Sequence, residues 1–219
     1  MKNYADKQEL ILSQIKDKFC QRRDFSGCDF SGIDLSAVDL SGVNLMRADL
    51  TGANLSGSNL TDTKLNGANL IQANLCRANL SQADLSSANL YQADLSYANL
   101  CGSSLRRTQC SHTNLWGASL CDADLTEADL SDATLIEASL NEANLFRANL
   151  TGAKLCGATL VEANLTQVNF TNADLTSTNL TQANLTAANL WETKISYAKL
   201  RDTIMPDGTI RAPEMIISH

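Results

Sequence analysis

The sequence predicts an all-β solenoid, in which the chain winds into a tube around an aliphatic core. A bulky apolar residue returns at every fifth position from Phe25 to Leu200, which gives (200 − 25)/5 + 1 = 36 units, and Leu fills 31 of them. A small residue, most often Ala, precedes each large one by two positions, and Asn or Asp usually lies between them. The chain has only two prolines, as expected where backbone groups must pair from one turn of the tube to the next.

A period of five fits neither an α-helix, with its period of 3.6, nor a flat strand, with its period of two. Leucines five apart would wind around a helix or alternate between the faces of a strand, and many would be exposed. All of them stay inside if the chain turns a corner once per unit, so that each unit forms one side of a tube. Periodicity alone does not decide between three and four sides per coil.

The five-residue unit resembles the motif of a known family. Units such as Ala73-Asn74-Leu75, Ala83-Asp84-Leu85 and Ala93-Asp94-Leu95 are similar to the repeats of pentapeptide-repeat proteins of the cyanobacterial type. The resemblance covers roughly four-fifths of the chain. It implies a right-handed quadrilateral β-helix with four units per coil, and 36/4 then gives about nine coils. Fold alone does not imply a function.

The N-terminal segment has a different pattern. Asn3 is a candidate helix N-cap, and residues 4–19 contain an apolar side. We interpret residues 1–22 as a capping α-helix, because the first coil would otherwise expose its leucine layer and unpaired backbone groups. A helix that binds a membrane surface or a partner is the alternative. The β-helix is expected over residues 23–205.

One coil in the middle of the tube departs from the motif. Ser103, Thr108 and Thr113 replace the inward Ala, and Cys110 replaces an inward Leu. Tolerated sequence drift is the interpretation that we favour. The alternative is a local loosening or bulge over residues 103–113.

The repeat ends near Met205, since Pro206 has no backbone N–H to donate to another coil. Pro206-Asp207-Gly208 is typical of a turn, and the ending Met-Pro-Asp-Gly resembles the close of some cyanobacterial members of the family. Residues 206–219 are therefore expected to form a C-terminal turn and tail. The sequence does not decide whether residues 211–219 are ordered.

No catalytic or cofactor-binding residues are predicted. The two histidines, His112 and His219, support no nucleophile–histidine constellation, and no phosphate-binding glycine loop occurs. The Asp and Asn residues before each Leu are expected to bond nearby backbone groups. The acidic run over residues 122–132 lacks the spacing of a calcium loop, so no metal site is predicted. We expect a protein that is not an enzyme and carries no cofactor.

Cysteine content and apolar runs bear on the compartment. No run approaches the 18 apolar residues of a membrane span and no signal peptide opens the chain, so a cytoplasmic protein without membrane contact is expected. Seven cysteines are mostly expected to be reduced there. Cys20 and Cys28 leave an alternative open, because a similar disulfide ties cap to tube in some exported relatives.

Residues twenty apart stack if each coil has four sides. Cys76, Trp116, Ile136 and Cys156 then share one outward stripe, which has the character of a contact patch. Packing between coils is the alternative explanation of the stripe. Acidic residues between positions 122 and 142 are expected to form a rim beside it. The predicted protein-interaction residues are Trp116, Ile136, Cys121, Asp122 and Glu142.

Two functions remain. The first is a non-enzymatic scaffold that presents a rigid surface for protein–protein interaction, including in regulation, as some cyanobacterial members of the family do. The alternative is a DNA mimic that binds DNA gyrase, as other family members do. A formal net charge of −7 and a pI of about 4.8 argue against direct nucleic-acid binding. The chain has no inserted loop of the kind that those mimics project, so the scaffold is favoured. We expect protein partners of unknown identity and a monomer or weak homodimer.

Overall fold

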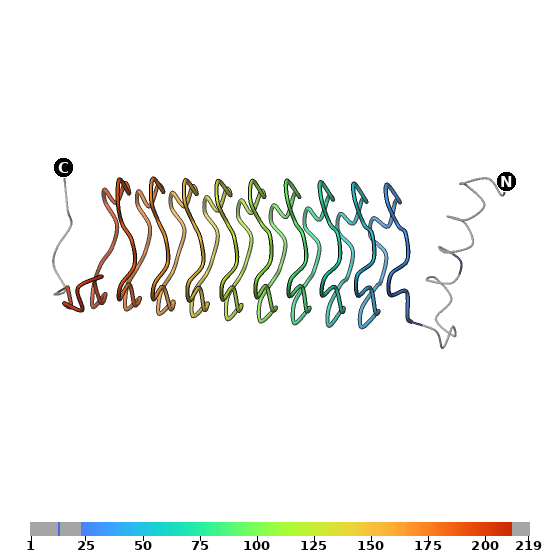
Figure 1. Ribbon diagram of the computed structural model, residues 1–219, viewed down its shortest axis with the longest axis horizontal. Coiled ribbons are helices and arrows are strands. Elements are labelled where there is room, and N and C mark those ends of the chain that lie inside the picture. Colours follow the sequence, from blue (N-terminus) through green and yellow to red (C-terminus); the bar gives the residue numbers. More distant parts are fainter. Residues whose placement is uncertain (1–12, 14–22, 212–219) are drawn as a thin grey trace.

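Residues 23–211 form a rod of stacked coils that runs from the blue end to the red end of Figure 1. A computed structural model describes residue 13 and residues 23–211. Parallel bridges join each residue before an inward Leu to the residue twenty positions later, from Asp24↔Asn44 to Asn184↔Ile204. Because the chain turns a corner every five residues, each coil has four sides. Sequence positions twenty apart therefore stack directly.

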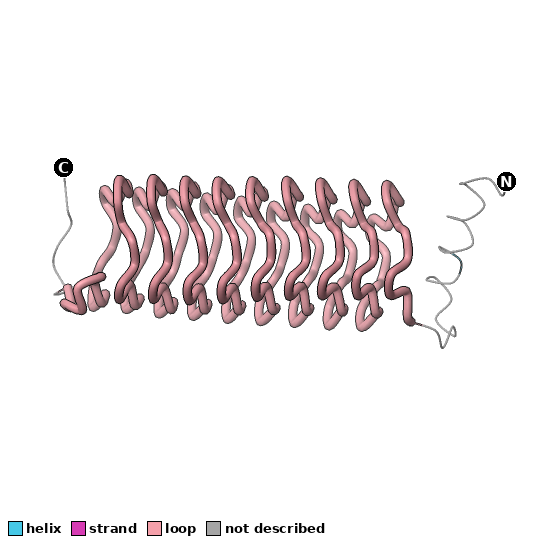
Figure 2. The backbone as a smooth tube through the Cα atoms, viewed as in Figure 1, coloured by secondary structure: helices cyan, strands magenta, loops and turns pink. Residues whose placement is uncertain are grey.

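The β-structure of residues 23–211 consists of single bridges rather than strands with several residues, so this part of the chain has the pink colour of loops and turns in Figure 2. The N–H of Leu35 donates to the C=O of Asn54 at 2.7 Å, and the N–H of Asn54 donates to the C=O of Ile33 at 2.8 Å. Each side is too short between its corners to form a longer strand. The predicted all-β class thus takes the form of a ladder of one-residue bridges. Outside the coils, residue 13 is helical.

Each corner is a turn closed by the inward residues on either side of it. At the Leu115 corner, the N–H of Ala118 donates to the C=O of Leu115 at 3.1 Å. The second residue of every corner has a positive φ, as position i+2 of a type II turn requires. Over the 36 corners whose second residues run from position 27 to position 202, the second residue is glycine in ten cases and another residue in 26. Both corner residues point away from the core.

The core is a stack of leucine layers with alanine between them. The inward leucines from Leu35 to Leu185 are at most 1% exposed, and most inward alanines are buried as well. Burying one Leu side chain contributes about 1.5–3 kcal/mol. A single coil buries few such side chains, so the stability of the rod comes from neighbouring coils packing on each other.

The coil with the weakest motif is as regular as the others. The buried hydroxyls of Ser103 and Thr108 each donate to a backbone carbonyl of their own turn at 2.7 Å, and Thr113 donates to the C=O of Leu90 at 2.8 Å. Bridges continue through this coil without a bulge. The buried Cys110 thiol donates to Thr108 Oγ1 at 3.3 Å, and burial raises its pKa to about 12. Tolerated drift is therefore the better interpretation, since each of these buried polar side chains has a hydrogen-bond partner.

The C-terminal turn reverses the chain at the end of the rod. The N–H of Gly208 donates to the C=O of Met205 at 2.9 Å, and Ile204 pairs with Ile210 in antiparallel orientation. The N–H of Arg211 also donates to the C=O of Thr203, at 3.0 Å. The last described residues thus lie back along the final side, whereas most of the predicted tail lies beyond them.

Several predictions fall outside the described residues. These are the cap over residues 4–19, apart from residue 13, and the pairing of Cys20 with Cys28. The segment boundaries and the total of about nine coils likewise stay predictions. Within the described residues, no helix is long and apolar enough to cross a membrane.

Candidate protein-interaction surface

The predicted site residue Trp116 lies in an exposed aromatic pair. As the first residue of its corner, Trp116 points outward and is 44% exposed. Its ring stacks on that of Tyr97 from the preceding coil, with 5.8 Å between the centroids and a tilt of 38°. Tyr97 is 50% exposed, and the guanidinium carbon of Arg77 lies 6.0 Å from its centroid. The pair therefore presents two large rings to solvent on successive coils.

Gly117 makes room for this arrangement. A Cβ atom at Gly117 would lie 2.7 Å from Cε1 of Tyr97, a distance that neighbouring carbon atoms do not tolerate. Gly117 also has a φ of +62°, which glycine adopts without strain. The Tyr97 ring thus lies over Gly117, the corner position that has no side chain. We call Tyr97, Trp116 and Gly117 the aromatic corner.

The rest of the predicted stripe is less exposed than expected. Ile136 follows Trp116 in the stack but is half-buried, as are Cys76 and Cys156. Ser96, which lies one coil before Trp116, is only 7% exposed. At this corner of the middle coils, the exposed apolar surface is therefore concentrated in Tyr97 and Trp116, with Ile136 at its edge.

The other predicted site residues lie at the next corner along the chain. Cys121 is the half-buried first residue of that corner, and Asp122 is its exposed second residue. Glu142 and Glu162 follow Asp122 on the next two coils and are also exposed. The coils stack at about 4.8 Å, so these carboxylates form a row. We call Asp122, Glu142 and Glu162 the acidic corner.

One side of the tube separates the aromatic corner from the acidic corner. Its outward residues are small and polar, as at Asn99, Ser119 and Ser139. Three extended residues between the corners give this side a width of about 10 Å. The structure thus brings the predicted residues onto the two edges of one face, which we call the aromatic–acidic face. They do not form a single cluster.

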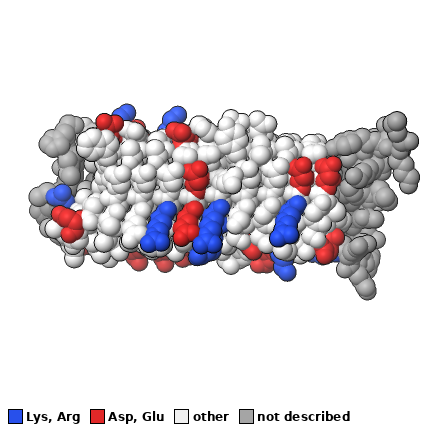
Figure 3. Space-filling view, in the orientation of Figure 1, with Lys and Arg blue, Asp and Glu red and all other residues white. Residues whose placement is uncertain are grey.

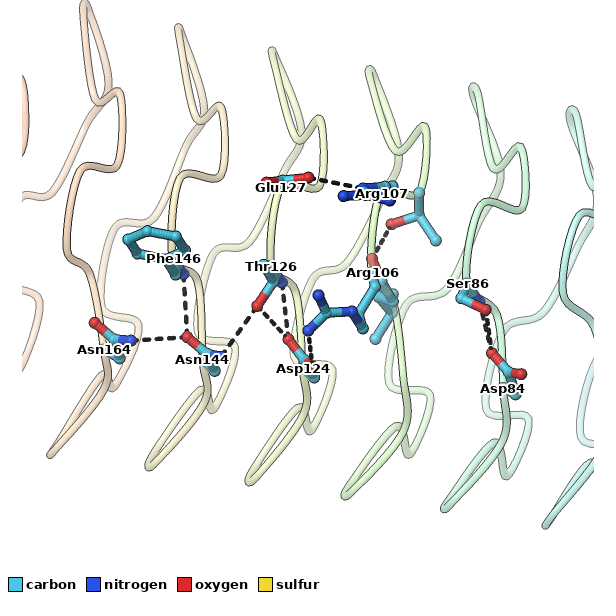
Figure 4. A network of polar contacts seen from close by, with 12 residues as sticks. Asp84, Ser86, Arg106, Arg107, Asp124, Thr126, Glu127, Asn144, Phe146 and Asn164 are labelled. Atoms are coloured by element: carbon cyan, nitrogen blue, oxygen red, sulfur yellow. Dashed lines mark hydrogen bonds and ion pairs between the residues drawn. The ribbon is translucent and has the colours of Figure 1, made fainter.

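Two of the remaining acidic residues of the middle coils, Asp124 and Glu127, pair with arginines of the preceding coil. Arg107 Nε donates to Glu127 Oε2 at 2.7 Å, and Arg106 pairs with Asp124 at 2.8 Å (Figure 4). His112 Nε2 lies 3.9 Å from Asp132. Arg107 and Glu127 are the neighbours that stacking residues twenty apart predicts, whereas Arg106 reaches a carboxylate 18 positions later.

These ion pairs help to lower the pKa of the carboxyl groups that they contact. The hydrogen bond from Arg107, followed by its charge, lowers the pKa of the Glu127 carboxyl. Partial burial works against ionisation of Asp124, but hydrogen bonds from Thr126 and Arg106 still hold its pKa below the ordinary value. Arg147 does not extend the row of ion pairs. It donates to Gln167 at 2.7 Å, and its guanidinium lies over the ring of Phe146.

The Asp and Asn residues before each Leu act as predicted. Asn114 Oδ1 accepts the N–H of Trp116 at 3.2 Å and so fixes the start of the aromatic corner. Asn164 Nδ2 donates to Asn144 Oδ1 at 2.9 Å along the stack (Figure 4). On the face seen in Figure 3, charged side chains gather in a few places and most of the surface is uncharged. No group of three His, Cys, Asp or Glu side chains in the described part of the chain is placed to hold a metal ion.

Comparison with known proteins agrees with the repeat and the coil. The profile of the pentapeptide repeats matches eight copies, over residues 28–67, 68–107, 103–141, 143–182 and 169–205. The chain belongs to the pentapeptide-repeat family. The four-sided coil is accordingly the right-handed β-helix of that family. No curated protein sequence matches the chain.

Three solved pentapeptide-repeat structures illustrate the relationship. HetL, involved in heterocyst differentiation regulation in the cyanobacterium Nostoc, is 31% identical, with 96% of this chain and 100% of HetL covered and a TM-score of 0.35. A thylakoid-lumen protein of Arabidopsis thaliana is 34% identical over 47% of this chain and 68% of its own, with a TM-score of 0.35. QnrB1, a plasmid-mediated fluoroquinolone resistance protein, is 21% identical over 84% of this chain and 94% of its own, with a TM-score of 0.50.

Sequence reasoning missed Tyr97. The predicted stripe followed only the first residue of each corner, whereas Tyr97 is the second residue of its corner. Its signal was the glycine twenty positions later, since Gly117 leaves the space that the Tyr97 ring fills. Aromatic residues at second corner positions, followed after twenty residues by Gly, are the pattern that would have found it.

Proposed function

We propose that this protein is a non-enzymatic scaffold whose aromatic–acidic face binds another protein. The observation that carries the proposal is the exposed, stacked pair of Tyr97 and Trp116. Tyr and Trp are enriched among the few residues that supply most of the binding energy of protein interfaces. Their stacking also restricts both rings before binding, which reduces the entropy that a partner contact must overcome.

The surroundings of the pair match the usual anatomy of a contact. Apolar anchors at the centre of an interface are bordered by a polar and charged rim. Here the polar side of the tube that contains Ser119 and Ser139 adjoins the aromatic pair. Asp122 and Glu142 lie at the far edge of that side. A partner with an apolar pocket and nearby basic residues would complement this face. The net charge of −7 makes nucleic acid an unsuitable direct ligand.

We further propose a regulatory role, exerted by a monomer or a weak homodimer. HetL, which is 31% identical over nearly the whole chain, is involved in the regulation of heterocyst differentiation. Regulation by a rigid rod needs only a fixed surface that a partner recognises. The repeated core of this chain supplies a rigid rod, and corner side chains that differ from coil to coil supply a surface that a partner can recognise.

The test is capture of partners from a cell extract, compared by quantitative mass spectrometry between the parent and Trp116→Ala. We expect at least one partner to bind about 30-fold more weakly to Trp116→Ala, since loss of a central aromatic residue costs about 2 kcal/mol or more. The melting temperature should stay unchanged, because Trp116 lies outside the core. Trp191→Ala is the matched control, since Trp191 is also a first corner residue and is 68% exposed, near the end of the rod. If every partner binds Trp116→Ala as well as the parent, the scaffold site is wrong.

A second candidate function rests on the acidic corner. Asp122, Glu142 and Glu162 place a row of carboxylates along the rod, and a DNA mimic that binds DNA gyrase would use such a row. Asp122→Asn/Glu142→Gln/Glu162→Gln would then abolish inhibition or protection in a gyrase supercoiling assay. The unbroken bridges from Asp24 to Ile204 leave no projecting loop within the described coils, so we favour the scaffold. We therefore expect the parent to leave gyrase supercoiling unchanged.

A further inference from the structure

Two cysteines lie directly over each other on the aromatic–acidic face. Cys101 and Cys121 are the first residues of the same corner on successive coils. The N–H of Gly102 donates to the C=O of Cys121 at 2.9 Å, so the two corners are joined by a backbone hydrogen bond. Both side chains are half-buried and both thiols are free. The fold has therefore brought together two thiols that are separated by twenty residues in sequence.

Ser119 connects the two sulfur atoms. Its Oγ lies 3.0 Å from Cys101 Sγ and 3.8 Å from Cys121 Sγ, so the sulfurs are at most 3.0 + 3.8 = 6.8 Å apart. The coil spacing of about 4.8 Å falls within the Cα–Cα range of about 4.4–6.8 Å found in disulfides. Because disulfides have Cβ atoms about 3.5–4.5 Å apart, joining the sulfurs takes rotation of the two side chains and a small approach of the two corners.

We propose that Cys101 and Cys121 are a redox-active dithiol, a modification site that small-molecule disulfides convert into a bond between adjacent coils. No other two cysteines in the described coils share this relation. Cys76 and Cys156 occupy equivalent corner positions, but (156 − 76)/20 = 4 coils, or about 19 Å, separate them. Cys110 is 1% exposed inside the core, out of reach of an oxidant.

The reaction is a pair of thiol–disulfide exchanges with a low-molecular-weight disulfide, RSSR. The thiolate of one cysteine attacks RSSR, forms a mixed disulfide and releases RS⁻. The second thiolate then attacks the protein sulfur of that mixed disulfide and releases another RS⁻. The two protein thiols lose two electrons and two protons, the two electrons reduce RSSR, and the two RS⁻ take up two protons to give 2 RSH. This step does not depend on the proposed protein contact.

The experiment uses full-length protein with Cys20→Ser and Cys28→Ala, which leaves 7 − 2 = 5 cysteines. The protein is incubated with oxidised glutathione, quenched in acid, alkylated and mapped by mass spectrometry. We expect a peptide pair linked through Cys101 and Cys121, with the free thiol count falling from five to three if the remaining cysteines are not glutathionylated. Cys76, Cys110 and Cys156 should form no internal bond. Reduction should restore five thiols.

Cys101→Ser in the same background separates the proposal from non-specific oxidation. Serine occupies the equivalent position one coil earlier, at Ser81, so the variant should fold with an unchanged melting temperature. Its Cys121 should stop at the mixed disulfide with glutathione, whereas Cys156→Ser should still form the Cys101–Cys121 bond. Separate mixed disulfides on Cys101 and Cys121 in the parent background, or no reaction at either, would overturn the proposal.

Discussion

The corners whose second residues lie at positions 27–67 and those whose second residues lie at positions 72–147 share one backbone geometry. They differ in the side chains at that second position. All have a positive φ at their second residue. Glycine fills six of the nine second positions in the first set and only two of the sixteen in the second set. The core beneath is alike in both regions, with a buried Leu in nearly every unit. The main difference between the two regions therefore lies in the side chains at their corners.

This difference indicates where the molecule is specialised. The left-handed conformation is favourable for glycine, and it costs a residue with a Cβ on the order of 1 kcal/mol. The middle corners bear side chains in spite of that cost. The aromatic corner, the ion pairs of Arg106 and Arg107 and most of the acidic corner all lie in this region or adjoin it. The first coils thus extend the rod, while the middle coils offer the recognisable surface.

The largest expected effect tests whether the core is equivalent in the two regions. Leu60→Ala and Leu120→Ala each remove a fully buried side chain and leave a cavity in the core. Each should lower the free energy of unfolding by about 2–5 kcal/mol. Urea unfolding measures both, and the two losses should agree within about 1 kcal/mol, which lies within the spread of such series. A much smaller loss at Leu120 would mean that the middle coils are packed differently.

A smaller effect is expected at the corners themselves. Gly57→Ala should destabilise the protein by about 1 kcal/mol, because Gly57 has a φ of +64°. No atom lies within 4 Å of the added Cβ, so the cost comes from the backbone alone. Ser87→Gly is the reverse change in the middle region, at a φ of 56°, and should leave stability equal or slightly higher. Thermal unfolding of the two variants compares them, and a destabilised Ser87→Gly would show that corner strain is not the difference between the regions.

The sequence was sufficient to predict the core and the corners, but not the contacts between corner side chains. A strict period of five places every large residue inside, and Leu105 and Leu125 are buried as that period requires. It also predicts that Trp116 and Asp122 point outward. The β-structure consists of one-residue bridges, because a corner every five residues leaves each side too short for a longer strand. Ile136 is less exposed than predicted because the neighbouring coils cover part of its side chain.

Contacts across coils depend on side-chain direction, which a repeat does not encode. Arg147 lies as close in the stack to Glu127 as Arg107 does, since each is twenty positions away, yet it bonds Gln167 and packs on Phe146. Tyr97 lies over Gly117, where a Cβ would contact its ring at 2.7 Å. The partner that a corner side chain contacts therefore depends on the space that the next coil leaves. Aligning the sequence in steps of twenty and reading both corner positions recovers some of these contacts.

The smallest expected effect concerns the ion pair of Arg107 and Glu127 in the middle region. The Arg107 side chain is largely exposed and the Glu127 side chain is partly exposed, so Arg107→Ala should change stability less than Gly57→Ala. Because the pair lowers the pKa of Glu127, its contribution is present above the carboxyl's unfolded pKa and is lost as pH falls through the lowered value. Melting curves of parent and variant should therefore differ slightly at pH 7 and converge in acid. A difference that persists at pH 2 would assign the effect of Arg107 to packing of its side chain rather than to charge.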